Sequence, residues 1–259
     1  MPELPEVEMA RRLLEAKALH HKITSVDVRD WRILNSVSAQ DLKRALAGRQ
    51  LCSALRHGKR LFLQIDSGLW LTLHLGMTGW PVFPEKGDEE PRYTRLRIGF
   101  EGGAALALQD ARIFGEVRLT ESPQEFLARR GIGPDALQMD REAFLASMSG
   151  RKRKIKPALL DQSLIAGLGN LYADEALFQS GICPQARCLK RERLETLYSA
   201  IQEVLRTSLA SNAHFEKLPD TYLLPHRHLG GACPRDGAAL QRKKIAGRTS
   251  YYCPLHQKK

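Results

Sequence analysis

The spacing of hydrophobic residues divides the chain into a helical start, a strand-rich middle and a helical second half. Apolar residues recur every three or four positions over residues 5–19, which predicts an amphipathic helix. Short strand-like runs follow, separated by turn signals such as Asp66-Ser67-Gly68 and Glu101-Gly102-Gly103. These runs cover residues 23–28, 51–55, 60–65, 69–75, 95–100, 104–108 and 116–119. So many short strands predict a β-sandwich or barrel.

Helical spacing returns after a polar and strongly basic segment, residues 147–156, which we interpret as a linker. Pro157 is expected to open a helix over 158–164, and Gly167–Asn170 a turn into a helix over 171–179. A longer helix is predicted over 191–209, and the last segment has short strands with Cys and Gly. We therefore expect an α+β multidomain protein. Its predicted parts are 1–146, the linker 147–156, a helical domain 157–225 and a hairpin segment 226–259.

Charge is distributed unevenly between the two halves. Residues 1–150 contain 21 basic and 20 acidic residues, whereas residues 151–259 contain 19 basic and 9 acidic ones. Almost all of the net charge of +11 therefore lies in the second half. A basic surface that merely favours solubility would not be segregated in this way, so the pattern indicates a face that binds a polyanion.

Composition excludes several classes of protein. The 259 residues are 43% hydrophobic, enough for real cores. No apolar run approaches the ~18 residues of a membrane span, and residues 1–20 are too acidic for a signal peptide. Five cysteines, an odd number, suit a reducing compartment better than a disulfide framework. We expect a cytoplasmic protein with no membrane partner.

The first residues could carry covalent chemistry. If Met1 is removed, Pro2 becomes a secondary amine with a pKa near the usual ~7.7–8 of an α-amino group, so a useful fraction is neutral. Such an amine can attack a sugar carbon, and Glu3 supplies an adjacent acid. The same residues also fit an ordinary helix start, with Pro5 early and acids in the first turn.

Six sequence pieces, in a fixed order, resemble the formamidopyrimidine-DNA glycosylase / endonuclease VIII family over nearly the whole chain. They are PELPEVE at the start, HGKR at 57–60, HLGMTG at 74–79, DARIFG at 110–115, IKPALLDQSLIAGLGNLYADEALF at 155–178, and a hairpin ending GRTSYYCPLH. The resemblance is closer to the formamidopyrimidine branch.

The resemblance implies a leading helix and β-sandwich, a helix–two-turns–helix DNA-binding domain and a zinc-finger-like hairpin. It also implies a monomeric, nucleoid-associated base-excision repair enzyme of bacterial type that binds duplex DNA with oxidised bases or abasic sites. Pro2 would attack C1′, Glu3 would move protons, and elimination would cut the strand. The alternative is a non-catalytic lesion- or nucleic-acid-binding protein of the same fold, since the helix–two-turns–helix element also occurs in RNA-binding proteins without enzymatic activity.

Four further residues are implied to hold the DNA near the reaction. By resemblance, Lys59 lies at the damaged nucleotide, Asn170 and Arg248 contact its phosphate, and Lys156 adds charge to the same backbone. Three of them have a plainer interpretation as well. Lys59 could protect a strand edge, Asn170 could cap a helix, and Arg248 could be a solvated loop charge. The helix start at Gly167–Asn170 is itself an expected anion site.

Three other residues are implied to replace a base that has been rotated out of the stack. In the formamidopyrimidine branch, the Met of HLGMTG and the Arg and Phe of DARIFG do this, and here they are Met77, Arg112 and Phe114. Met77 and Phe114 could instead be core residues. Residues 210–224 lack the Gly-rich loop that covers an oxidised purine in that branch, which weakens an expectation of purine specificity.

The hairpin differs from the family's usual four cysteines. Its two pairs are Cys233 with Asp236 and Cys253 with His256, each with two intervening residues. Thiolate, carboxylate and imidazole all bind zinc, so we expect one structural zinc and no cofactor for the chemistry. His226 and His228 are possible substitutes, and some members of the family keep the hairpin without metal.

Overall fold

The computed structural model describes residues 1–85 and 87–258. Contacts divide the chain into two compact units, Met1–Pro2 with Glu6–Arg130, and Glu3–Pro5 with Gly131–Lys259. The boundary therefore falls at residue 130, earlier than the predicted 146. The reason is that helix α4 (Arg141–Met148) packs on α7 (Arg191–Ala210), where the Phe144 and Tyr198 rings lie 5.6 Å apart.

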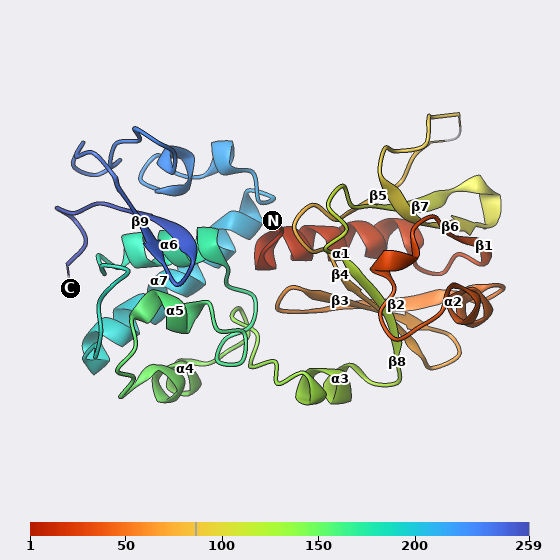
Figure 1. Ribbon diagram of the computed structural model, residues 1–259, viewed down its shortest axis with the longest axis horizontal. Helices are drawn as coiled ribbons and strands as arrows, with labels where there is room; N and C mark the ends of the chain where they lie inside the picture. The colour runs from red at the N-terminus through yellow and green to blue at the C-terminus, as the bar shows by residue number, and fades with distance from the viewer. Residues whose placement is uncertain (86, 259) are drawn as a thin grey trace. The chain divides into compact units, whose positions relative to one another are not determined.

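The first unit contains two four-stranded antiparallel sheets, with α1 (Leu4–Ala18) running beside them (Figure 1). One shared apolar core includes residues from α1 and from both sheets. All seven predicted strands are present. One sheet has the order β1 (Ile23–Val28), β6 (Thr94–Phe100), β7 (Ala105–Gln109), β5 (Trp80–Val82), and the other has β2 (Leu51–His57), β3 (Arg60–Ile65), β4 (Trp70–His74), β8 (Glu116–Thr120).

Several short elements of the first unit escaped sequence prediction. Strand β5 is short, has Pro81 at its centre and lies at a sheet edge, where the missing N–H is tolerated. Helices α2 (Ala39–Leu46) and α3 (Pro123–Arg129) are each preceded by a capping serine. Ser38 accepts from the Asp41 N–H and Ser122 from the Glu125 N–H, so Ser-x-x-acid was the available signal. The 3₁₀ turns are Trp31–Ile33 and Glu101–Gly103.

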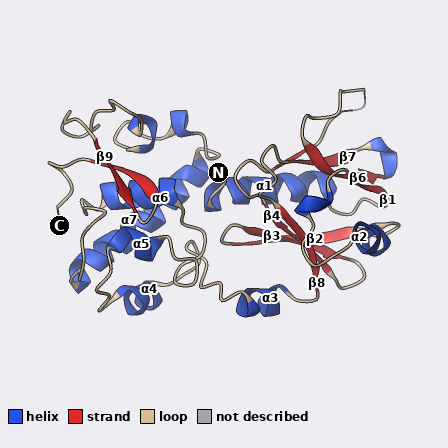
Figure 2. Ribbon diagram, viewed as in Figure 1, coloured by secondary structure: helices blue, strands red, loops and turns tan. Residues whose placement is uncertain are grey.

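The second unit is mainly helical, whereas strands dominate the first (Figure 2). Its core is formed by α4, α5 (Ile155–Leu159), α6 (Asn170–Gln179), α7 and the 3₁₀ turns Phe215–Lys217 and Leu224–His226. The predicted linker extends into α5, and the helix ends at Leu159 instead of Leu164. Ile155 is buried and its N–H donates to the Ala186 carbonyl, so this end of the basic segment belongs to the core.

The chain closes with an antiparallel hairpin of β9 (Gln241–Ile245) and β10 (Arg248–Tyr252). Its two turn residues, Ala246 and Gly247, have φ values of 47° and 75°, the left-handed conformation that a tight hairpin turn requires. Arg248 is consequently the first residue of the returning strand. Within the described residues, no helix has the length and apolar character to cross a bilayer.

Candidate functional site

Glu3 is a buried carboxylate that caps helix α6. Its Oε1 accepts from the Leu171 N–H at 2.9 Å and its Oε2 from the Tyr172 N–H at 3.2 Å. These first-turn N–H groups have no partner inside the helix, and the helix dipole favours a negative charge there. The sequence predicted a phosphate or an Asn170 cap at this helix start. The Asn170 cap is wrong, because Gly169 is the capping residue and Glu3 accepts from the first-turn N–H groups, whereas the contact of Asn170 with a phosphate stays a prediction.

Two glycines make this approach of the N-terminal segment possible. A side chain at Gly169 would overlap the Glu3 carboxylate, and one at Gly167 would overlap Leu4. Gly167 also has a φ of 111°, which a residue with a side chain rarely adopts, and its carbonyl accepts from the Leu4 N–H at 3.2 Å. The glycine-rich turn therefore fixes Glu3, which directly follows the partly exposed Pro2 in the chain.

Asn170 links α6 to the hairpin. Its Nδ2 donates to the Thr249 carbonyl at 2.9 Å, while its buried Oδ1 has no hydrogen-bond partner among the described residues. Thr249 follows the exposed Arg248. Asn170 and Arg248, predicted from distant motifs, are thus brought to one place by the contact between α6 and β10.

Lys156 does not have the exposed position that a phosphate contact needs. Its side chain is fully buried, and its Nζ lies 2.5 Å from Asp174 Oδ1 and 2.5 Å from Ser250 Oγ. Burial lowers the Lys156 pKa, although Asp174 opposes this shift. A cation held in this way cannot reach the DNA backbone, so the structure corrects its predicted role.

Asp174 organises the whole cluster and was missed in the sequence. Besides Lys156, it accepts from Arg227 at 2.8 Å and from the Tyr251 N–H at 3.2 Å. Arg227 also donates to the Thr249 carbonyl at 2.9 Å. The carboxylate therefore joins α5, α6, β10 and the segment after residue 226. The available signal was a pair of acidic residues, Asp174 and Glu175, in a largely apolar helical segment.

In the first unit, Asp110 ties together the two loops that contain the predicted wedge residues. It is buried and accepts from Thr78 Oγ1 at 2.5 Å, from the Arg112 N–H at 3.2 Å and from the Gly115 N–H at 2.7 Å. The Thr78 hydroxyl also accepts from the Arg112 N–H at 3.1 Å. The Asp110 side chain therefore fixes both loops.

Met77, Arg112 and Phe114 are exposed rather than part of the core. The exposed fractions of Met77 and Phe114 are 38% and 54%, and the Arg112 guanidinium lies 4.9 Å from the centre of the Phe114 ring. Gly76 permits this, because a side chain there would overlap the Phe114 backbone. The structure thus favours the wedge interpretation over the core interpretation.

Lys59 lies in the two-residue turn between β2 and β3, not along a strand edge. Across the same sheet, Arg60 pairs with His74, whose Nδ1 accepts from the Gly76 N–H at 3.2 Å. Burial, and then the charge of Arg60, lower the His74 pKa to about 4, so its ring is neutral at physiological pH. His74 fixes the start of the Met77 loop. The signal available in the sequence was the HLGMTG motif, which contains both His74 and Met77.

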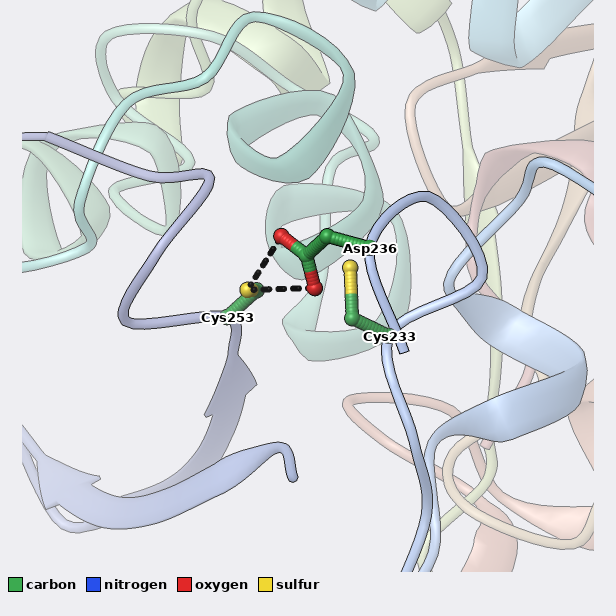
Figure 3. A group of neighbouring side chains, drawn as sticks. All are labelled: Cys233, Asp236 and Cys253. Carbon is green, nitrogen blue, oxygen red and sulfur yellow. Dashed lines mark hydrogen bonds between the residues drawn. The ribbon is translucent and has the colours of Figure 1, made fainter. Parts of the chain in front are cut away.

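The predicted metal ligands converge only in part (Figure 3). Donor atoms of Cys233, Asp236 and Cys253 lie within 4.8 Å of one another. His256 does not join them, because its Nε2 lies 2.8 Å from the Phe178 carbonyl and its ring packs on Phe178. Neither His226 nor His228 belongs to the group, as far as the described residues extend. Two sulfurs and one carboxylate are ligand types that bind zinc, and they supply three of the four ligands usual in a structural zinc site.

Comparisons with known proteins agree with this geometry. The formamidopyrimidine-DNA glycosylase N-terminal domain model matches residues 1–117, and the formamidopyrimidine-DNA glycosylase H2TH domain model matches residues 131–218. A formamidopyrimidine-DNA glycosylase of Pelotomaculum thermopropionicum is 34% identical over 100% of this chain and 99% of its own length. One from Trichormus variabilis is 36% identical over 98% of both chains.

A solved structure of the Lactococcus lactis formamidopyrimidine-DNA glycosylase, non-covalently bound to DNA containing an AP site, is also similar. Its TM-score is 0.91 at 30% identity, covering 99% of this chain and 100% of that one. Another structure, of the wild-type Lactococcus lactis protein with DNA containing N7-benzyl-Fapy-dG, has the same TM-score and identity over 100% of both chains.

Proposed function

The chain belongs to the formamidopyrimidine-DNA glycosylase family, and from this premise we propose that it is a bifunctional DNA glycosylase and AP lyase. It excises oxidised bases from duplex DNA and cuts the strand at the resulting abasic site. The observation that carries the proposal is the buried Glu3 carboxylate, fixed on the first turn of α6 one residue from Pro2.

The reaction begins once removal of Met1 has freed the Pro2 amine. The Pro2 nitrogen attacks C1′ and passes its proton to the Glu3 carboxylate, and the C1′–base bond breaks with its electron pair leaving on the base, which takes a proton from water. Glu3 protonates the sugar ring oxygen, so that the ring opens to an iminium, and it then accepts and returns protons during elimination. The capping hydrogen bonds hold Glu3 in place, so little reorganisation accompanies each proton transfer.

Phosphate binding falls to Arg248, Asn170 and Lys59. Arg248 opens β10 next to the residue that binds Asn170, so a single phosphate can be contacted by both. Lys59, in the turn between β2 and β3, would supply a cation at the damaged nucleotide. Lys156 acts indirectly, as part of the Asp174 cluster that fixes β10 against α6.

The exposed group of Met77, Arg112 and Phe114 fills the space left by the extruded nucleotide. Apolar side chains occupy the gap in the stack, and the guanidinium pairs with the unpartnered base. Preorganisation by Asp110 lowers the cost of presenting these side chains to the duplex.

A structural zinc ion fits the hairpin. Cys233, Asp236 and Cys253 would hold it, and it would stabilise the segment that positions Arg248 without taking part in the chemistry. Metal analysis of protein purified without chelator should find about one zinc per chain, and Cys253→Ser should lose it. Metal-free protein with full DNA affinity would contradict the assignment. Because the substrate is genomic DNA, we place the enzyme in the cytoplasm with the nucleoid, acting as a monomer.

Borohydride trapping on duplexes with an abasic site tests the proposal. Protein whose N-terminus is shown by mass spectrometry to be Pro2 should form a covalent adduct, whereas protein retaining Met1 should not. Pro2→Gly keeps an amine and should retain some trapping, and Glu3→Gln should trap poorly although its size is preserved. Equal trapping with Met1 intact would refute the mechanism. Binding without any adduct would favour the non-catalytic alternative.

A further inference from the structure

Three arginines of the first unit, one of them Arg60 next to Lys59, surround one buried phenyl ring. Phe126 lies on α3, and its ring centre is 5.2 Å from the Arg60 guanidinium and 5.6 Å from those of Arg118 and Arg130. A single such contact is an ordinary cation–π interaction. Three guanidinium groups on one ring form a concentrated positive charge, held in place by an apolar anchor.

One carboxylate is shared by all three arginines. Glu116, whose side chain is 17% exposed, lies 3.4 Å from Arg60, 3.1 Å from Arg118 and 3.0 Å from Arg130. No other ion pair is made by these three arginines within the described residues, so two positive charges of the group lack a partner anion. The repulsion is evident at Arg60, whose pKa is lowered by burial and by Arg130 and Arg118 despite Glu116.

A cavity of about 340 Å³ opens beside this group. Arg118, Phe126 and Arg130 are among the residues that line it, so two of the three arginines border the space. Its rim includes the exposed Glu121 and a solvated pair of Arg129 with Glu125, whose side chains are 81% and 60% exposed. These rim charges are too exposed to neutralise the inner arginines. The amide oxygen of Asn35 accepts from Arg118 and helps to fix that side chain.

We propose that this cavity is an oxyanion site, which takes one phosphate group against Arg118 and Arg130. Planar guanidinium groups match phosphate oxygens in two-pronged hydrogen bonds, and stacking on Phe126 holds the groups in position before binding. The phosphate comes either from the DNA backbone away from the lesion or from a small phosphorylated molecule. The site requires neither Pro2 nor Glu3, so a test of this site is independent of a test of the catalytic proposal.

The test compares Arg130→Gln with Arg129→Gln, which removes the same charge from the adjacent residue at the rim. In the first arm, thermal unfolding is followed against inorganic phosphate at constant ionic strength. Phosphate should raise the melting temperature of the wild type and of Arg129→Gln. The increase should be much smaller for Arg130→Gln. Because the two variants have equal net charge, phosphate bound elsewhere on the basic surface cancels in the comparison.

The second arm follows the affinity for undamaged duplex against salt. If the occupant is a backbone phosphate, the slope should fall by about 0.9 in Arg130→Gln relative to Arg129→Gln. If Arg130→Gln keeps the salt slope of DNA affinity but loses the stabilisation by phosphate, the occupant is a small phosphorylated ligand. Identical behaviour of the two variants in both arms overturns the site. Arg118→Lys retains the positive charge and should keep part of the stabilisation by phosphate. This variant shows whether a lost response merely reflects misfolding. Borohydride trapping should be unchanged in Arg130→Gln and Arg129→Gln.

Discussion

The α6–β10 cluster of the second unit and the wedge loops of the first unit both depend on one buried aspartate, but in chemically different ways. Asp174, which is buried, binds two cationic side chains, Lys156 and Arg227. Asp110 instead accepts from a hydroxyl and two backbone N–H groups. A buried ion pair is costly to break, because each remaining charge loses its compensation, whereas loss of neutral hydrogen bonds costs less.

The largest expected effect is that of Asp174→Asn. It leaves Lys156 and Arg227 without their anion, so the free energy of unfolding should fall by about 3–5 kcal/mol. Asp110→Asn keeps most of its shape and should cost only about 1–3 kcal/mol. Urea unfolding of both variants at neutral pH measures the difference. Equal losses of stability in the two variants would show that the charge of the hydrogen-bond partners does not explain the difference between the two regions.

The second effect concerns pH and the neutral His74. Its folded pKa of about 4 lies below the usual 6.5, so the unfolded chain binds more protons between these values and stability must fall as the pH is lowered from 6.5 to 4. The loss attributable to this side chain should be about 2–3 kcal/mol. His74→Asn retains an acceptor near Nδ1 and should remove that part of the pH dependence. An unaltered pH profile would place the cause in another group.

The third effect separates Arg248 from Lys156. Arg248→Ala should reduce the slope of DNA affinity against salt by about 0.9, because one phosphate contact is lost. Lys156→Met should leave that slope nearly unchanged, while destabilising the fold by leaving Asp174 with one cation fewer. A flattened slope in Lys156→Met that remains well folded would restore the phosphate contact expected from the sequence.

The smallest effect on stability, at most about 0.5 kcal/mol, is expected for Phe114→Ala because the ring is exposed. Excision from damaged duplex should nevertheless fall much more than cleavage of a preformed abasic site, since only the former requires base extrusion. For comparison, truncating the buried Phe62 should cost about 3–5 kcal/mol. A large loss of stability in Phe114→Ala with unchanged lesion selectivity would assign this residue to the core.

The spacing of apolar residues and the turn residues were sufficient to predict the main helices and strands. The strand runs, the two hairpin turns, α1, α6 and α7 were all predicted, because their apolar spacing is set by which side chains face a core. Short, capped elements such as α2 and α3 were missed, because few apolar residues define them. The boundary near residue 130 was missed because it depends on α4 packing against α7, a contact between distant segments.

The sequence by itself determined where the motifs lie and which residues are predicted to carry the chemistry, since Pro2, Glu3, Met77, Phe114 and Arg248 stand in recognisable local patterns. Only the tertiary structure decided which of the charged groups are available. It buries Lys156 against Asp174, places Glu3 on the α6 amides, and turns His256 toward a carbonyl. A local pattern specifies a side chain, but its burial and its ionic partner come from segments far away in the chain, and these set the free energy of its charge.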